Sequence, residues 1–293
     1  MDIALTVLEI VAPVFLLAAV GFAWVRMGFE YRVQFVTRLG MSLATPCLVF
    51  VALMQSEIEP SALGALSLAG FAAYGLVTMA MWGLVSAGRL DRQTYLAPLI
   101  FSNTGNLGLP LALFAFGDVG LGYAVVVFAV SAMIQFTFGI WLVSGGGSLL
   151  KMIQEPLVPA TVLGAVFLVM DWQTPTFLTN ALELIAQMAI PIMLITLGVA
   201  VARLSIGAFG KPLILSVFKV IISAACASAA GWWFGLDPVA FGVLVLQVAT
   251  PVAVTSYMLA EKYGAEAEAV AGLVVVSTLM SVLTLPIILA FVL

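Results

Sequence analysis

The residues best suited to chemistry lie in one short stretch, Asn103-Thr104-Gly105-Asn106-Leu107-Gly108-Leu109-Pro110, inside an apolar segment from about Tyr95 to Phe116. Glycine costs about 1 kcal/mol and proline about 3 kcal/mol in a helix interior. In lipid, freed backbone groups have no water to bond, so a break is tolerated only inside protein or beside a wet cavity. We therefore expect a broken helix, whose unpaired N–H groups can bind an anion together with the amides of Asn103 and Asn106.

The composition indicates an integral membrane protein. Of the 293 residues, 64% are hydrophobic and 8% are charged, whereas soluble domains carry about 25% charged residues. The sequence contains no histidine, which excludes histidine metal sites, histidine general bases and Ser-His hydrolase chemistry. We expect no enzyme activity, no cofactor and no nucleic-acid partner. Cys47 and Cys226 lie in apolar segments and are expected to pack as small apolar residues.

The broken stretch must be positioned by membrane-spanning helices, each of which needs about 20 apolar residues. Ten such segments use nearly the whole chain, and we number them as predicted spans 1 to 10. Their approximate bounds are Leu5–Val25, Val33–Met54, Ala62–Ala87, Gln93–Phe116, Val119–Val143, Pro156–Met170, Phe177–Val201, Pro212–Phe234, Val239–Ala260 and Ala267–Leu293. The predicted fold class is an all-α integral membrane protein with ten transmembrane helices.

The loop charges alternate along the chain. Loops after odd-numbered spans carry the basic residues Arg26, Arg32, Arg89, Arg92, Lys151, Arg203, Lys211 and Lys262. Loops after even-numbered spans carry no Lys or Arg and hold the acidic residues Glu57, Glu59, Asp118, Asp171 and Asp237. The positive-inside rule then places the odd-numbered loops in the cytoplasm. We predict a multi-pass protein of the inner (plasma) membrane with both termini extracytoplasmic.

The two halves of the chain, 1–143 and 156–293, resemble each other across a linker at 144–155. Matching features recur at an offset of about 146 residues: Pro46 with Pro191, Leu90-Asp91 with Leu236-Asp237, and Thr137 with Thr284. Each half has five predicted spans, so the halves must have opposite topology. Inverted repeats with broken helices are typical of secondary transporters.

The repeat predicts a second break in predicted span 9, because Thr104-Gly105 corresponds to Thr250-Pro251. Gln247 lies one turn before this proline. Its side chain is equally expected to contact a substrate or ion, or to form a hydrogen bond between helices. Lys219, inside predicted span 8, can either extend to the membrane surface or face a cavity and attract an anion. The predicted substrate-binding residues are Asn103, Gly105, Asn106, Pro110, Lys219, Gln247, Thr250 and Pro251.

Four spans carry a proline but no polar break: Pro13, Pro46, Pro159 and Pro191 lie in predicted spans 1, 2, 6 and 7. A proline inside a helix kinks it. We expect these four spans to form a scaffold. Predicted spans 3–5 and 8–10 would then form a transport unit that contains both breaks.

The stretch Ser102–Pro110 resembles the Asn-x-Gly-Asn-x-Gly-x-Pro core of the auxin efflux carrier family. Ala249-Thr250-Pro251-Val252-Ala253 and Ala44-Thr45-Pro46 also resemble that family. The resemblance implies a fold similar to that of bile acid/sodium symporters, with crossing spans 4 and 9, and a homodimer. It implies transport of small organic anions, namely auxin in plants and carboxylates such as malate or malonate in some bacterial members. The long cytoplasmic loop of the plant exporters is missing here, which disfavours auxin itself.

The sequence therefore predicts a secondary active or facilitative carrier of a small organic anion, acting by an elevator-type movement within the lipid bilayer. The alternative is a sodium-coupled symporter or a cation antiporter of similar fold. A proton antiporter needs carboxylates inside the membrane, and no aspartate lies deep in a predicted span. Coupling to sodium or protons stays open at this point.

Overall fold

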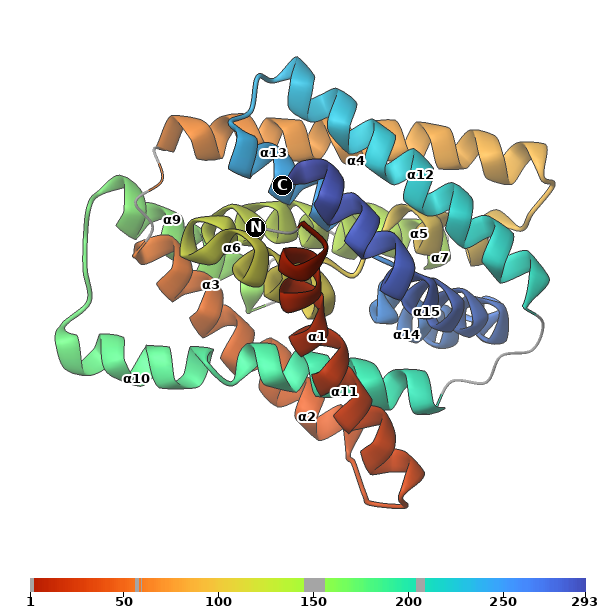
Figure 1. Ribbon diagram of the computed structural model, residues 1–293, viewed down its shortest axis with the longest axis horizontal. Helices are drawn as coiled ribbons and strands as arrows, with labels where there is room; N and C mark the ends of the chain where they lie inside the picture. The colour runs from red at the N-terminus through yellow and green to blue at the C-terminus, as the bar shows by residue number, and fades with distance from the viewer. Residues whose placement is uncertain (1–2, 56–57, 59, 145–155, 204–208) are drawn as a thin grey trace.

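The computed structural model describes residues 3–55, 58, 60–144, 156–203 and 209–293 (Figure 1). Nearly all of the predicted linker (145–155, with Lys151) lies outside the described residues, as do Glu57 and Glu59. The described residues form helices and no strands. The α-helices are α1 (Ile3–Arg26), α2 (Val33–Leu39), α3 (Thr45–Met54), α4 (Pro60–Ala87), α5 (Arg92–Ile100), α6 (Leu109–Ile134), α7 (Ile140–Ser144), α9 (Leu157–Val169), α10 (Thr176–Ala186), α11 (Ala189–Arg203), α12 (Gly210–Trp233), α13 (Pro238–Val248), α14 (Val254–Tyr263) and α15 (Ala267–Val292).

Three π-helical segments adjoin α-helices and lengthen them. They are η1 (Gly40–Ala44), η2 (Thr104–Gly108) and η3 (Gln135–Gly139). η1 lies between α2 and α3, η2 leads into α6, and η3 lies between α6 and α7. Single π-turns inside α-helices are rare and occur often at functional sites.

Seven described helical stretches are long and apolar enough to cross a membrane, and two shorter apolar helices accompany them. This count differs from ten because several predicted spans are interrupted or short. One stretch, Thr104–Ser144, runs through Gly117, whose φ of 65° and ψ of −157° are not helical. It combines the second half of predicted span 4 with predicted span 5. Predicted spans 4 and 9 are each divided into two helices, and α9 is short.

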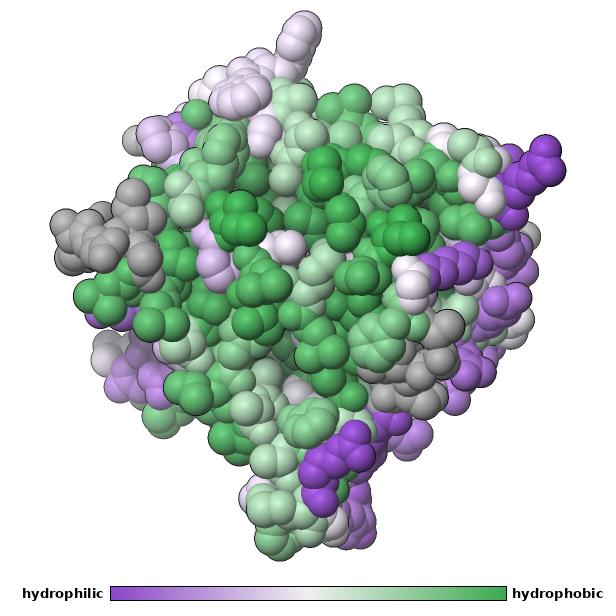
Figure 2. All heavy atoms as spheres, turned by 45° about the vertical axis from the view of Figure 1, so that its right-hand side comes forward, coloured by the Kyte–Doolittle hydropathy of each residue, from purple (hydrophilic) through white to green (hydrophobic). Residues whose placement is uncertain are grey.

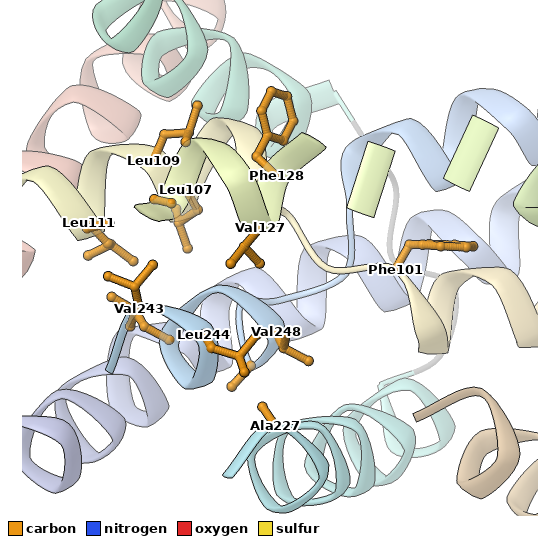
Figure 3. Packing of buried hydrophobic residues seen from close by; sticks show 14 of the residues in the cluster. Phe101, Leu107, Leu109, Leu111, Val127, Phe128, Ala227, Val243, Leu244 and Val248 are labelled. Carbon is orange, nitrogen blue, oxygen red and sulfur yellow. The ribbon is translucent and has the colours of Figure 1, made fainter. Parts of the chain in front are cut away.

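The helices pack in two main groups. Extensive contacts join α1 to α11 and α3 to α9 and α10, and a second set joins α4, α5, α6, α12, α13 and α15. In Figure 1, α4 lies along one long edge of the molecule and α10 with α11 along the opposite edge. Buried side chains such as Leu111, Val127, Val243 and Leu244 pack together around α6 and α13 (Figure 3). This core holds the two divided helices in place.

Large apolar side chains cover the outside of the molecule. Leu16, Phe177 and Trp233 are 66%, 77% and 86% exposed. In Figure 2, hydrophobic residues cover most of the face shown, and hydrophilic residues gather toward its edges. Soluble monomers rarely expose apolar patches above a few hundred Å². The surface is therefore that of a protein embedded in lipid, as the composition predicted.

Candidate functional site

Two helices of the core are interrupted, and the interruptions contact each other. The first separates α5 from η2 at 101–103, and the second separates α13 from α14 at 249–253. Asn103 N donates to Pro251 O at 2.8 Å, and Ala253 N donates to Phe101 O at 3.2 Å. These bonds form a short antiparallel bridge at Ser102 and Val252. We call this arrangement the crossing. Each break satisfies freed backbone groups of the other, as burial in an apolar environment requires.

Lys219 lies directly against the crossing. Its side chain is completely buried, and its Nζ donates to Ser102 Oγ at 2.7 Å and to Thr250 O at 2.8 Å. Ser102 Oγ in turn donates to Val248 O at 2.6 Å. Within the described part of the chain, the ion pair found is Arg32 with Glu30 at the surface, so no carboxylate neutralises Lys219. Its Nζ instead lies against Thr250 O, just beyond the C-terminal end of α13, where the helix dipole is negative.

A small cavity of about 100 Å³ borders the crossing, and we call it the crossing cavity. Asn103, Thr104, Gly105 and Asn106 line it from the first break, and Ala253, Val254 and Thr255 line it from the second. The side chain of Asn103 is 4% exposed, and its Nδ2 has no hydrogen-bond partner among the described residues. A buried unpaired donor costs about 1–3 kcal/mol, so a ligand acceptor here would be strongly favoured.

Backbone donors add to this polar end of the crossing cavity. η2 begins at Thr104 and α14 begins at Val254, and neither helix start is capped by a side chain. In the described residues, the amides of Gly105, Asn106, Val254 and Thr255 form no backbone hydrogen bond. Two helix N-termini thus reach the same cavity, each with a partial positive charge. No Asp, Glu, Lys or Arg is among the described residues that line it.

All three π-helical segments contribute to the crossing cavity. Its lining includes Gly40 and Met41 of η1, residues of η2, and Gln135 and Phe136 of η3. A π-turn rotates the side chains that follow it relative to an α-helix and widens the local backbone. Their convergence on one cavity makes this region the candidate functional site.

Comparison with known proteins shows the family of the chain. The model of a family described as "Membrane transport protein" matches residues 6–148 and residues 141–289. The chain belongs to this family of membrane transport proteins. The match confirms the resemblance to the auxin efflux carriers, because this family of membrane transport proteins is auxin efflux carrier-like.

Two relatives of this membrane transport protein carry transporter names. A protein of Methanothermobacter thermautotrophicus described as an uncharacterized transporter is 24% identical over 302 residues, covering 95% of this chain and 96% of its own. A protein of Methanocaldococcus jannaschii with the same description is 26% identical over 198 residues, covering 64% of each chain. Both relatives are thus described as transporters.

In this membrane transport protein, the predicted site residues divide into two sets. Asn103, Gly105 and Asn106 line the crossing cavity. The others lie outside its lining: Thr250 and Pro251 form the second break, Pro110 lies in the first turn of α6, Gln247 lies on α13, and Lys219 lies on α12. Lys219 neither extends to the surface nor faces the cavity, so neither arrangement expected from the sequence is observed.

Gln247 forms a contact between helices. It is completely buried, and its Nε2 donates to Ala124 O of α6 at 3.3 Å. Its amide oxygen lies against Gly108, where an added Cβ would come within 1.9 Å of it. Glycine at position 108 therefore permits the close packing of Gln247. The structure shows the helix–helix hydrogen bond rather than a contact with the crossing cavity.

Gln135 and Phe128 are lining residues that sequence reasoning missed. Gln135 Nε2 donates to Thr255 Oγ1 at 2.8 Å, which joins η3 to α14 beside the crossing cavity. Gln135 could have been found from the sequence, because its side chain is an amide within an otherwise apolar predicted span. The ring of Phe128 packs against Gly105, where an added Cβ would lie 3.0 Å from Phe128 Cε2. Phe128 could not have been found in this way, because it is one of many phenylalanines in apolar segments.

A larger cavity of about 710 Å³ lies between α3, α10, α11 and α6 and contains no residue of either break. Asp118 and Glu183 line it together with Gln55 and Gln187, and no Lys or Arg does among the described residues. Gln55 Nε2 donates to Glu183 Oε1 at 2.7 Å. We call it the acidic cavity. Its charge disfavours a resting anion, so size alone does not make it the better candidate for the transport site.

Proposed function

We propose that the protein is a secondary active or facilitative carrier of a small organic anion, which binds in the crossing cavity through its carboxylate. The observation that carries this proposal is the set of unpaired donors at the crossing. Asn103 Nδ2 has no partner and lies in the cavity wall. The free amides of two helix starts lie beside it. Together they offer hydrogen bonds and partial positive charge without a full cation, as in other transporters with broken helices.

The alternative, a sodium-coupled symporter or cation antiporter, is less well supported. A cation site at broken helices is built from unwound backbone carbonyls. At the crossing, the carbonyls of Phe101, Pro251, Thr250 and Val248 all accept hydrogen bonds from protein donors. The amino group of Lys219 supplies one of these donors.

The movement that we propose is an elevator-type shift between two units. The groups of packed helices support this division: α1, α3, α9, α10 and α11 would form the scaffold, and α4–α7 with α12–α15 would carry the crossing cavity past it. The lining of the crossing cavity comes from both sides of this division, since Ile192 and Met193 of α11 contribute to it. We also propose ten spans in two inverted halves, an inner-membrane location with both termini outside, and a homodimer.

Uptake of radiolabelled carboxylates by proteoliposomes tests the site. Asn103→Ala and Asn106→Ala should each lower kcat/KM for a transported carboxylate by about tenfold or more, because a hydrogen bond to a charged group contributes about 1.5–3 kcal/mol. Asn180→Ala is the matched control, since Asn180 is exposed on α10. Wild-type uptake rates in both crossing variants would refute the assignment.

Thermal melting of the purified protein with carboxylates, with and without sodium, separates the two candidate functions. A ligand at 100 times its Kd stabilises a protein by about 2.7 kcal/mol. We expect carboxylates to raise the melting temperature equally in sodium and in potassium buffers. Stabilisation that requires sodium would favour the symporter.

A further inference from the structure

We infer that the protein binds an anionic phospholipid in a groove where the loop between α1 and α2 meets α11. The groove consists of two cavities of about 490 and 510 Å³, which share Tyr31, Arg32 and Phe35. We call it the arginine groove. It adjoins the crossing cavity, since Val33 lines both, but the inference does not depend on what the crossing cavity binds.

Two aromatic side chains indicate that the arginine groove lies at the level of the lipid headgroups. Tryptophan and tyrosine gather at the interfaces between membrane and water. Trp24 lies in the last turn of α1, and its Nε1 donates to Glu30 O at 3.2 Å. Tyr31 Oη shares a hydrogen bond of 2.7 Å with Thr196 Oγ1 of α11. In Figure 1, the loop that carries Tyr31 forms the lower tip of the molecule, where α1 turns into α2.

Two arginine side chains offer donors for a phosphate group. Arg32 lines both cavities of the arginine groove, and Arg203 lines one of them. Arg32 Nε donates to Glu30 Oε1 at 2.7 Å, and Arg203 Nη2 donates to Tyr31 O at 2.6 Å. A guanidinium group has five N–H donors, so most donors of each arginine stay available. Arginine binds phosphate oxygens in pairs, which makes these contacts strong and directional.

The charges of the arginine groove favour an anion. Its charged residues among those described are Arg32, Arg203 and Glu30, two positive and one negative, which gives a net charge of +1. Glu30 is paired with Arg32. In the proposed orientation this loop lies on the cytoplasmic side, where the leaflet carries anionic lipids and where basic pockets between membrane helices bind their headgroups.

An apolar wall lies beside the arginines. Val20, Trp24 and Phe35 are 50%, 43% and 65% exposed, and Val36 and Ile195 complete the wall. This wall accommodates the acyl chains of a lipid while the arginines hold its phosphate. A soluble anion has no part that matches the wall, so a phospholipid is the ligand that fits the whole groove.

Thermal melting in a neutral detergent tests the inference with phosphatidylglycerol, phosphatidylcholine and glycerol 3-phosphate as probes, the two lipids carrying the same acyl chains. For wild type, we expect phosphatidylglycerol to raise the melting temperature and to bind at least tenfold more tightly than the other two. Arg32→Gln and Arg203→Gln should each weaken its binding about fivefold, because a basic residue near anionic lipid contributes about 1 kcal/mol. Arg92→Gln is the matched control, since Arg92 also lies beside a tryptophan, Trp82, but outside the groove.

The results separate the lipid from other occupants of the arginine groove. Equal stabilisation by phosphatidylcholine would show that the headgroup charge is not recognised, and equal stabilisation by glycerol 3-phosphate would indicate a site for soluble phosphates; either result overturns the inference. A loss of affinity in Arg92→Gln as large as in Arg32→Gln would indicate diffuse surface charge and would overturn it as well.

The Arg32→Gln variant decides the outcome if Arg203→Gln does not fold. The Arg203 side chain holds Tyr31 O, so its loss can disturb the loop. The Arg32 side chain is 75% exposed and is hydrogen-bonded to the exposed Glu30, so its replacement leaves the packing intact. Unchanged affinity of Arg32→Gln for phosphatidylglycerol would rule out the proposed lipid site.

Discussion

The ammonium group of Lys219 lies where the two interrupted helices meet, and its hydrogen bonds join Ser102 of one to Thr250 of the other. Burying an unpaired polar group costs about 1–3 kcal/mol, so this position depends on Ser102 Oγ and Thr250 O, which accept the hydrogen bonds of Lys219. The side chain acts as a bridge in the centre of the fold. Its contribution is to the geometry of the crossing rather than to contact with the transported anion.

Replacing Lys219 by methionine should therefore destabilise the protein. Hydrogen bonds that involve a charged group contribute about 1.5–3 kcal/mol each, and Thr250 O would lose its Lys219 donor. We expect the melting temperature in detergent to fall by several degrees. Lys211→Met is the control, because Lys211 is exposed and its Nζ lies over the ring of Tyr95 rather than at the crossing. Equal melting temperatures for Lys219→Met and wild type would show that the bridge is not needed.

At the scale of single residues, the sequence indicated which residues are unusual for an apolar segment better than it indicated what each of them contacts. Asn103, Gly105 and Asn106 were singled out because amides and glycine are rare inside apolar segments, and they do line the crossing cavity. The roles of Gln247 and Lys219 depend on which helix lies opposite them. Ala124 O and Ser102 Oγ are far away in the sequence, so no local pattern could have chosen between the alternatives.

At the scale of elements, the first halves of the two divided helices begin in the same way. Asp91 precedes α5 and accepts a hydrogen bond from Thr94 N at 2.8 Å. Asp237 precedes α13 and accepts from Val239 N and Ala240 N, each at 3.0 Å. An aspartate at this position satisfies helix donors and complements the dipole. The two helices are thereby anchored at the ends away from the crossing.

The cap at Asp91 predicts a pH dependence of stability. The hydrogen bond from Thr94 holds the pKa of the Asp91 carboxyl below its ordinary value. Since the pKa is lower in the folded state than in the unfolded state, the charged cap stabilises the protein above the unfolded pKa of about 3.9. That contribution is lost as the pH falls through the folded pKa.

Melting temperatures of wild type and Asp91→Ala between pH 7 and pH 3 check this prediction. Loss of an N-cap costs about 1 kcal/mol, so wild type should be the more stable at pH 7. The difference should shrink as the pH falls below about 4. A difference that stays constant down to pH 3 would mean that the carboxylate charge is not what stabilises α5.

The sequence also predicted where the helices would be interrupted, but not their local form. Proline at position 110 does not lie in the break but near the start of α6, directly after η2. The chain leaves the helix earlier, at 101–103. The π-turns could not be predicted, because their backbone angles are close to those of an α-helix and depend on packing with neighbouring helices.

At the scale of the whole molecule, the two cavities differ in charge. Donors with partial positive charge line one end of the crossing cavity, whereas Asp118 and Glu183 line the acidic cavity between α6 and α10. If the anion passes through the acidic cavity, these carboxylates slow its approach through long-range repulsion. Such repulsion is screened at high ionic strength.

The double variant Asp118→Asn/Glu183→Gln should therefore transport a carboxylate severalfold faster than wild type at low salt, with the difference vanishing in high salt. Initial rates of uptake at about 0.01 M and 1 M ionic strength, where the screening length changes from about 30 Å to 3 Å, measure this effect. Asp171→Asn is the control, because Asp171 does not line the acidic cavity. Equal rates at low salt would show that the anion does not use this route.

The pairing of Ser102 with Val252 joins positions that are about 150 residues apart in the chain. During synthesis, the first half enters the membrane long before its partner strand exists. Until α13 and α14 are made, Asn103 N and Phe101 O lack the partners that they have at the crossing, in an environment that offers no water to replace them. A nascent chain that stops after the first half is therefore an incomplete product with an unsatisfied donor and an unsatisfied acceptor inside the membrane.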